Sequence, residues 1–395
     1  MRSFPVLADY PFRMTVASEQ EELLWLALRM TPQLGARRAV DIIEKFGSPG
    51  AIFQLDSREL EGAGLSASVA RSIEAGSAME DALEQQRLMR ATGTTILTYY
   101  DDRYPALLKQ IYDPPVLLFA RGDLGLLETP GVAIVGTRRP SPYGSSVAER
   151  FARELSEAGL LIVSGMARGI DTAAHKACLA VEGKTVAVLG CGADVIYPAE
   201  NKNLAAQIAR DGLILSEYPL RTPGYPQNFP VRNRIVSGLS SGVLIVEGAQ
   251  YSGSAITARL ALDQGREVFA IPGNITSKQS WGPNLLIRQG ARLVQEPSDV
   301  LCDLPLEARQ KLRSRGKQRL LIEEGAEFEH PMQALRAKVM QVMPFDVPVT
   351  IDEMLPKLNS SGMVSTSELI SILFDLELEG LIRQLPGKAY QRVWH

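Results

Sequence analysis

The sequence predicts an α/β protein built on an extended, doubly wound Rossmann-like sheet, with a small helical domain before it and a winged-helix domain after it. Between residues 91 and 302, short apolar runs alternate with alanine-rich helical segments. Such near-continuous apolar runs are typical of parallel strands buried on both faces. Two of the runs end in glycine turns, at Gly136 and Gly165, as in open α/β sheets that bind ligands at their strand ends.

The front of the chain is predicted to be helical. Residues 1–17 lack hydrophobic periodicity, so we expect a flexible tail. Residues 18–90 contain short amphipathic segments separated by glycine turns, as at Leu34-Gly35-Ala36. This pattern indicates a SAM-like or helix-hairpin-helix-like domain, in which a helix N-terminus can hold a DNA phosphate. Eight basic residues against twelve acidic ones argue against that use, and favour a module for packing or protein contact.

The middle of the chain, residues 91–302, is predicted to form the extended Rossmann-like domain. The expected strands are 95–99, 116–120, 131–135, 160–163, 185–189, 213–216, 242–246, 267–270 and 291–294. This is more than the six strands of a minimal Rossmann fold. Residues 130–300 carry 17 Lys and Arg against 14 Asp and Glu, and they are the only long basic segment. A polyanionic ligand should therefore bind here.

The last part of the chain is predicted to be a charged linker, residues 303–331, and a winged-helix domain, residues 332–395. Helices are expected at 333–343, 350–358 and 365–379, followed by a β-hairpin. The third helix carries four acidic residues and no Lys or Arg. We therefore expect that it does not enter the major groove of DNA, and that the domain serves protein contact, regulation or weak assistance through hairpin cations.

Composition narrows the function classes. No apolar run is long enough to span a bilayer and the first residues lack a signal-peptide core, so a cytoplasmic protein is expected. Three scattered cysteines and three histidines give no disulfide framework or metal site. Neither a dinucleotide fingerprint nor a P-loop is present. We expect no cofactor and no metal.

Two strand-to-helix turns predict a phosphate site. One runs from Ser164-Gly165 through Arg168-Gly169 to a helix beginning at residue 172, and the other is Gly136-Thr137-Arg138. Glycine allows close approach of the backbone, and the unpaired N–H groups and macrodipole of a helix start favour an anion. In the first turn, Asp171 is interpreted as a charge at the helix start and His175 as a structural residue.

Two further segments are expected to complete the site. Phe229 precedes Arg232, Asn233 and Arg234, a combination suited to base stacking and bidentate phosphate contact. The alternative is an intramolecular ion-pair cluster. The segment from Ser252 through Gly253 and Ser254 to Thr257 offers hydroxyls at a helix start. The alternative there is an ordinary N-cap.

Together these residues resemble the DNA-processing protein A family, DprA or Smf. The resemblance rests on Val135 to Arg138, Tyr143-Gly144, Ser164 to Asp171 with His175, Gly190-Cys191-Gly192, Ser216-Glu217, Phe229 to Arg234, Ser252 to Ser254 with Thr257, and Ile271-Pro272-Gly273. It is dense from about residue 90 to residue 300, and the helical front and winged-helix tail agree in order.

The resemblance implies a non-enzymatic homodimer that binds and protects incoming single-stranded DNA and loads RecA recombinase on it during natural transformation. A single-strand-binding protein is a further candidate partner. The implied DNA and phosphate site consists of Gly136, Thr137, Arg138, Ser164, Gly165, Arg168, Gly169, Phe229, Arg232, Asn233, Arg234, Ser252, Gly253, Ser254 and Thr257. The alternative function is an enzyme that hydrolyses a nucleoside monophosphate on the same fold, with Glu247 as its carboxylate catalyst.

Overall fold

The computed structural model divides the chain into two compact units, Met1–Gly316 and Lys317–His395. The structure describes residues 19–250, 252–312, 336, 338–340, 342–343, 349–359, 369, 372–373, 376–377, 381–385 and 389–392. The predicted tail, residues 1–17, lies outside these residues. Among the described helices, none has the length and apolar character needed to cross a bilayer.

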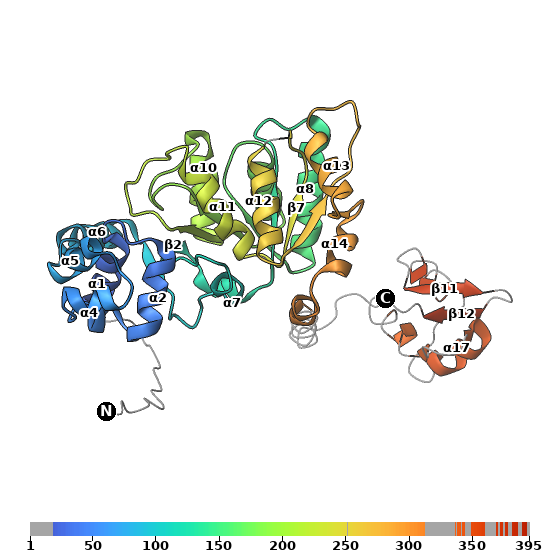
Figure 1. Cartoon of the computed structure of the whole chain (residues 1–395). Coiled ribbons are helices and arrows are strands. Elements are labelled where there is room, and N and C mark those ends of the chain that lie inside the picture. Colours follow the sequence, from blue (N-terminus) through green and yellow to red (C-terminus); the bar gives the residue numbers. More distant parts are fainter. Residues whose placement is uncertain are drawn as a thin grey trace. The chain divides into compact units, whose positions relative to one another are not determined.

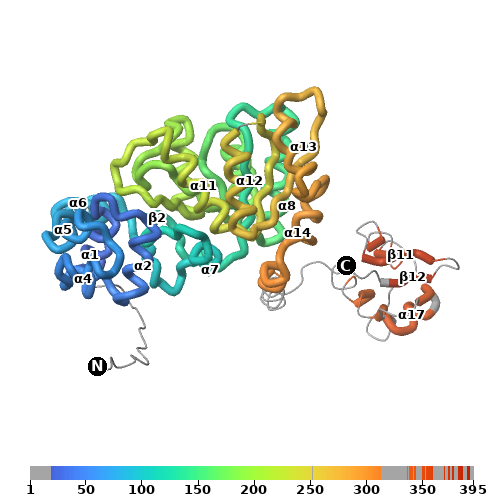
Figure 2. The backbone as a smooth tube through the Cα atoms, viewed as in Figure 1, coloured from blue at the N-terminus to red at the C-terminus, as the bar shows by residue number. Residues whose placement is uncertain are grey.

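The first unit begins with a helical domain that lies beside strand β2 (Figure 2). Its helices are α1 (Glu19–Met30), α2 (Ala36–Phe46), α3 (Pro49–Ile52), α4 (Ser57–Gly62), α5 (Ala67–Glu74) and α6 (Met79–Thr92). Local sequence sets the helix starts, because Ser48 caps α3 and Asp56 and Glu59 form a capping box at α4. Helices this short need mutual burial, which Trp25, Leu28 and Ile43 provide.

A nine-stranded sheet forms the centre of the first unit in the described part of the chain. Its strands are β1 (Thr95–Thr98), β2 (Leu117–Gly122), β3 (Gly131–Val135), β4 (Leu161–Ser164), β5 (Thr185–Leu189), β6 (Leu213–Ser216), β7 (Gly242–Ile245), β8 (Glu267–Ala270) and β9 (Arg292–Leu293). They follow the order β1-β2-β6-β5-β4-β3-β7-β8-β9. The strands from β6 to β9 in this order are parallel, whereas β1 and β2 add an antiparallel edge. The predicted fold class is confirmed.

Helices cover both faces of this sheet (Figure 1). The connecting helices are α7 (Ala106–Lys109), η1 (Leu124–Glu128), α8 (Pro142–Glu157), α9 (Ile170–Ala180), η2 (Ala199–Asn201), α10 (Lys202–Asp211), α11 (Asn228–Gly238), α12 (Gly253–Asp263), α13 (Trp281–Arg288) and α14 (Pro297–Asp303). Helices α8, α9 and α14 share one apolar core, and α10, α11 and α12 share the other. Strand β3 lies between β4 and β7, so the winding reverses there, where open α/β sheets bind ligands.

The packing of the sheet domain extends beyond α14. Residues 306–312 are helical, and Leu304 and Ala308 are buried in the same apolar core as Val300. The boundary expected at residue 303 is therefore too early, because Leu304 and Ala308 pack against the sheet domain. The rest of that segment, residues 313–331, lies outside the described residues.

The second unit has a small core of its own. Its described elements are β10 (Val349–Thr350), α17 (Ile351–Asn359), β11 (Ile382–Leu385) and β12 (Ala389–Arg392), with strand order β10-β12-β11. Met354, Leu369 and Ile382 are among its buried residues. The sequence predicted the hairpin and α17 but missed β10, which is only two residues long. Most of the predicted helices 333–343 and 365–379 lies outside the described residues.

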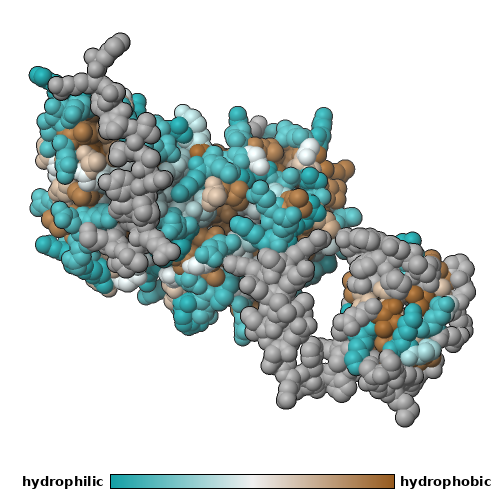
Figure 3. All heavy atoms as spheres, turned by 90° about the horizontal axis from the view of Figure 1, so that it is seen from below, coloured by the Kyte–Doolittle hydropathy of each residue, from teal (hydrophilic) through white to brown (hydrophobic). Residues whose placement is uncertain are grey.

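The surface seen in Figure 3 is mostly hydrophilic, with separate apolar patches between the hydrophilic areas. The view is from the lower side of Figure 1, the side on which α7 is drawn. Exposed apolar side chains are common on folded proteins, so single ones carry no functional meaning. Function has to be sought in cavities where charged and polar groups converge.

Candidate nucleic-acid interface

A cavity of about 440 Å³ opens at the carboxyl ends of the strands, where the sheet reverses its winding. Eleven of the fifteen predicted site residues line it, from four separate segments of the chain. They are Gly136, Thr137, Arg138, Gly165, Phe229, Arg232, Asn233, Ser252, Gly253, Ser254 and Thr257. The structure thus brings together residues up to about 120 positions apart, at the edge of the sheet where the sequence placed its glycine turns.

Gly169 holds two of the turns against each other. Its φ of 78° lies in the left-handed region, and a Cβ here would collide with the carbonyl oxygen of Thr137. The N–H of Ile170 donates to the same oxygen at 3.3 Å. Gly169 lies outside the cavity lining that the described residues form, so it shapes the site rather than facing a ligand.

The start of α12 contributes polar groups to the cavity. Ser252 occupies the N-cap position, yet its side chain makes no capping hydrogen bond within the part of the chain that the structure describes. Its hydroxyl lies 2.7 Å from that of Ser254 instead. The first N–H groups of a helix have no partner within the helix, and they favour an anion. The ordinary N-cap alternative does not describe this helix start.

Arg232 is the buried cation of the cavity, with only 4% of its surface exposed. Its Nη1 donates to the carbonyl oxygens of Gly165, at 2.7 Å, and Val188. Burial lowers the pKa of Arg232, while the nearby Asp171 acts in the opposite direction. The two carbonyl oxygens do not neutralise the guanidinium, and the carboxylate of Asp171 offsets part of its charge.

Asp171 stands beside Arg232 and also lines the cavity. Burial raises its pKa to about 6, although Arg232 and the N–H groups of Ala167 and Gly165 act to lower it. Its Oδ2 accepts from Gly165 N at 3.1 Å and Ala167 N at 3.3 Å. Asp171 therefore fixes the glycine turn at the start of α9, consistent with its interpretation as a charge at a helix start.

Aromatic side chains form another part of the cavity wall. Phe229 is half-buried, and the guanidinium carbon of Arg138 lies 5.6 Å from its ring centroid. The ring of Tyr197, 45% exposed, lies 5.2 Å from Phe229. Sequence reasoning missed Tyr197. The available signal was its position shortly after the Gly190-Cys191-Gly192 strand end, which the sequence marks as part of the same sheet edge.

Two more of the predicted residues lie outside the described lining of the main cavity. Ser164 is buried, and its hydroxyl donates to Ile134 O at 2.6 Å, which leaves it a structural role. Arg168 is exposed and pairs with Glu200 at 2.8 Å. It lines a smaller recess of about 30 Å³ that shares Arg138 and Phe229 with the main cavity. An exposed pair of this kind is weak and can open for a competing anion.

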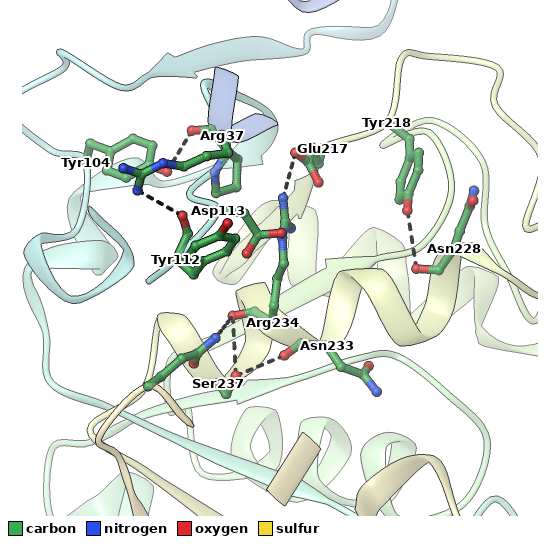
Figure 4. A network of polar contacts seen from close by, with 12 residues as sticks. Arg37, Tyr104, Tyr112, Asp113, Glu217, Tyr218, Asn228, Asn233, Arg234 and Ser237 are labelled. Atoms are coloured by element: carbon green, nitrogen blue, oxygen red, sulfur yellow. Dashed lines mark hydrogen bonds and ion pairs between the residues drawn. The ribbon is translucent and has the colours of Figure 1, made fainter. Parts of the chain in front are cut away.

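Arg234 requires a correction, because it lies outside the main cavity lining that the described residues form. Figure 4 shows its guanidinium between Asp113 and Glu217. Nε contacts Asp113 and Nη2 contacts Glu217, each at 2.9 Å, and 6% of the Arg234 side chain is exposed. Burial acts to lower the pKa of Arg234, but the two carboxylates raise it overall. The ion-pair alternative thus describes Arg234, whereas its neighbour Arg232 faces the cavity.

The same ion-pair cluster connects α11 to the helical domain. Arg29 of α1 donates from Nη2 to the backbone oxygen of Glu217 at 2.9 Å. Arg37 of α2 donates to the backbone oxygen of Tyr112, next to Asp113, at 3.1 Å. These contacts anchor one side of α11 while its other side lines the cavity. The helix that carries Phe229, Arg232 and Asn233 is therefore fixed from behind.

Glu247, the catalyst of the alternative enzymatic function, is already engaged. Its carboxylate accepts from Ser141 N at 2.8 Å and from Ser141 Oγ at 2.5 Å, at the start of α8. It is buried and is not among the described residues that line the cavity. His175 is likewise buried, with Nδ1 2.7 Å from Thr185 Oγ1. Neither arrangement presents an acid or base to a ligand in the cavity.

Comparisons with known proteins agree with this architecture. The family model described as DNA recombination-mediator protein A matches residues 95–305, and the DprA winged helix domain model matches residues 329–388. The chain is 45% identical over 217 residues to the DNA processing protein DprA of Bacillus subtilis (strain 168), which is 55% of this chain and 73% of that protein. It is 42% identical over 286 residues to protein Smf of Escherichia coli (strain K12), 72% of this chain and 74% of the relative.

A solved structure extends the comparison to three dimensions. The X-ray structure of DNA processing protein A (DprA) from Streptococcus pneumoniae has a TM-score of 0.63 and 37% sequence identity to this chain. The match covers 74% of this chain and 100% of that one. The resemblance seen in the glycine turns is thereby confirmed over the whole sheet domain, and the expected winged-helix domain is confirmed by its own family model.

Proposed function

This chain belongs to the DNA recombination-mediator protein A family, and we propose that it binds single-stranded DNA without acting on it chemically. One observation carries the proposal. The cavity combines a buried guanidinium, an open helix start and half-buried aromatic rings at the topological switch point of the sheet. These groups suit the phosphates and bases of an unpaired strand.

In this proposal the phosphate is held by charge and by backbone donors. Arg232 supplies a fixed cation, and the first N–H groups of α12, near Gly253, supply hydrogen bonds and the positive end of the helix dipole. Arg138 is exposed at the rim and adds a cation that can follow the backbone. Phosphate contacts carry no sequence information, so strands of any sequence should bind with similar affinity.

The preference for an unpaired strand comes from the aromatic rings. Phe229 and Tyr197 form a wall on which a base can stack, and Arg138 extends it by cation–π contact. A base in a duplex is already stacked and paired, so its faces are not accessible to such a wall. The cavity should therefore select single-stranded over duplex DNA.

The finer role follows from the family resemblance. We propose that the protein acts as a homodimer in the cytoplasm, where it protects incoming DNA and loads RecA recombinase during natural transformation, with a single-strand-binding protein as a further partner. A cavity of 440 Å³ holds a short stretch of strand. A second protomer would lengthen the track, and multivalency raises affinity without new kinds of contact.

Anisotropy titrations with fluorescent single-stranded and duplex DNA of equal length, over a range of salt concentrations, test the binding. We expect a clear preference for the single strand and a steep loss of affinity with salt. Arg138→Gln should lower the slope of log K against log salt by about 0.7. Arg153→Gln is the matched control, since Arg153 is also exposed but lies outside the described cavity lining.

The same samples test the alternative and the finer role. If the chain does not bind DNA but releases the base from a nucleoside monophosphate, it is an enzyme and the proposal fails. If DNA binding holds, RecA filament assembly on strands covered by single-strand-binding protein is measured next. Acceleration by the unaltered protein but not by R138Q would support loading, and equal rates with and without the protein would refute it.

A further inference from the structure

A second cavity lies on the opposite edge of the sheet, at the amino ends of β3, β7 and β8. It has a volume of about 170 Å³. Its lining combines apolar residues, namely Leu107, Leu127, Pro130, Leu239, Pro305 and Ala308, with polar ones such as Gln110, Ser241 and Lys311. Because the DNA site uses the carboxyl ends of the strands, this cavity is separate from it and is not explained by the proposed function.

One buried cation in this cavity forms no ion pair within the described part of the chain. Arg266, just before β8, is 8% exposed and lines the cavity. Its Nη2 donates to Leu107 O at 2.6 Å, and its Nε is buried without a hydrogen-bond partner. Among the described carboxylates, none forms an ion pair with Arg266. Burial alone accounts for the lowered pKa of its guanidinium.

A buried guanidinium without a carboxylate partner lowers the stability of the folded protein. A buried charge is normally paired, since desolvation outweighs a single hydrogen bond to a neutral carbonyl. Arg234 illustrates the ordinary solution, with two carboxylates at 2.9 Å. Glu128 and Glu307 also line the Arg266 cavity, but both are exposed and neither reaches the guanidinium. Charged groups that line a cavity although they lower the stability of the fold commonly bind a ligand.

We propose that this cavity binds a carboxylate attached to a short branched apolar group, with the carboxylate on Arg266. The planar fork of arginine matches a carboxylate, and among the described residues the carbonyl oxygen of Leu107 is the one acceptor that its guanidinium reaches. The leucine and proline side chains of the wall suit an apolar group of leucine size. Two sources share this chemistry, namely a free branched-chain acid and the C-terminal residue of a peptide.

Saturation-transfer NMR on the full chain tests the proposal with matched probes. Isovalerate represents the free acid and isovaleramide its neutral counterpart. Acetyl-Gly-Gly-Leu, with a free carboxyl group, represents a peptide end, and its C-terminal amide is the control. We expect each acid to bind at least tenfold more tightly than its amide. Whichever acid binds more tightly identifies the source.

Arg266→Met removes the charge but keeps an apolar side chain of similar length. It should abolish the difference between acid and amide and leave binding of single-stranded DNA unchanged. Arg259→Met is the control, because Arg259 is exposed on α12 and is not among the described residues that line this cavity. Equal binding of acids and amides by the unaltered protein would overturn the proposal, and so would an R266M variant that folds and still prefers the acids. The comparison of acids with amides is made on the unaltered protein, so it does not depend on whether a variant folds.

Discussion

Replacing Gly165 with alanine tests whether the position of Arg232 matters for DNA binding. Gly165 lies in the turn after β4, directly against the buried guanidinium. A Cβ at this position would stand 2.5 Å from Nη2 of Arg232 and 2.8 Å from both its Cζ and Oδ2 of Asp171. Cβ atoms do not approach other atoms so closely, so the guanidinium or the turn has to move. No charge is removed by the substitution.

The size of the effect follows from what Arg232 would lose. Overpacking a buried site costs about 1–3 kcal/mol, and loss of a hydrogen bond from a charged donor adds to it. We expect G165A to lose about 3 kcal/mol of stability. If Arg232 also contacts a phosphate, that contact contributes about 1.5–3 kcal/mol. Affinity for single-stranded DNA should then fall roughly 10- to 100-fold.

The assay combines anisotropy titration with thermal unfolding, and two other glycines serve as controls. Gly253, at the start of α12, and Gly62, in α4, both have open space where a Cβ would point. G253A should keep its melting temperature but weaken DNA binding, because Gly253 lines the cavity and a methyl group there would lie near the bound strand. G62A should change neither property. If G165A loses stability but binds DNA as tightly as the unaltered chain, the argument for Arg232 is refuted.

Three further predictions concern base stacking, the ion-pair cluster and pH. Phe229→Leu should weaken binding of single strands by about 1–3 kcal/mol with little change in melting temperature, and unchanged affinity in the titration would argue against stacking. Glu217→Gln breaks an ion pair in which both side chains are buried, and it should lower the free energy of unfolding by about 3 kcal/mol. Asp113→Asn removes a carboxylate that is 41% exposed and should lower it by no more than about 1 kcal/mol. Equal losses for the two variants in urea unfolding would contradict this difference. Burial lowers the pKa of His175 to about 3, and Arg232 acts in the same direction. As the pH falls, the unfolded chain therefore protonates His175 before the folded protein does. The contribution of His175 to the free energy of unfolding is complete above about pH 6.5 and falls by about 1.4 kcal/mol per pH unit toward pH 3. Asp171, with its pKa raised to about 6, has the opposite effect, because its contribution to stability increases as the pH falls from about 6 to 3.8. The two effects are separated by measuring the stability difference between the unaltered protein and His175→Gln from pH 7 to 4.5, since both proteins contain Asp171. A difference that does not change with pH would exclude the His175 contribution.

The sheet was predictable because its signals are local. Each of the nine strands matches its expected range to within two residues, since an apolar run bounded by glycine or polar residues is sufficient to mark a buried parallel strand. Strand β10 escaped because two residues, Val349 and Thr350, show no periodicity. The linker boundary was wrong for a related reason. Leu304 and Ala308 lie among charged residues, and only the tertiary structure shows that they are buried.

The site was predictable in outline but not in the direction of each side chain. Glycine turns at strand ends meet at one sheet edge because the strands are parallel, so Gly136, Gly165 and Gly253 could be grouped from the sequence. Whether a polar side chain faces the cavity depends on partners elsewhere. Ser164 finds Ile134 O on the neighbouring strand, and Tyr197 comes to the cavity on a loop that gives no periodic signal.

Arg232 and Arg234 show where the information is missing. Residues two apart on a helix point about 200° apart, so the pair on α11 cannot both face the cavity, and periodicity alone does not say which one does. The two carboxylates that pair with Arg234 decide which arginine faces away from the cavity. Local sequence does not reveal them, because Asp113 is 121 residues away in the chain and Glu217 is 17 residues away. One arginine thus ties α11 to the rest of the fold and the other lines the cavity. Because Arg234 is paired with two carboxylates and Arg232 lines the cavity, charge removal at Arg232 should reduce the salt dependence of DNA binding, whereas charge removal at Arg234 should act through stability alone.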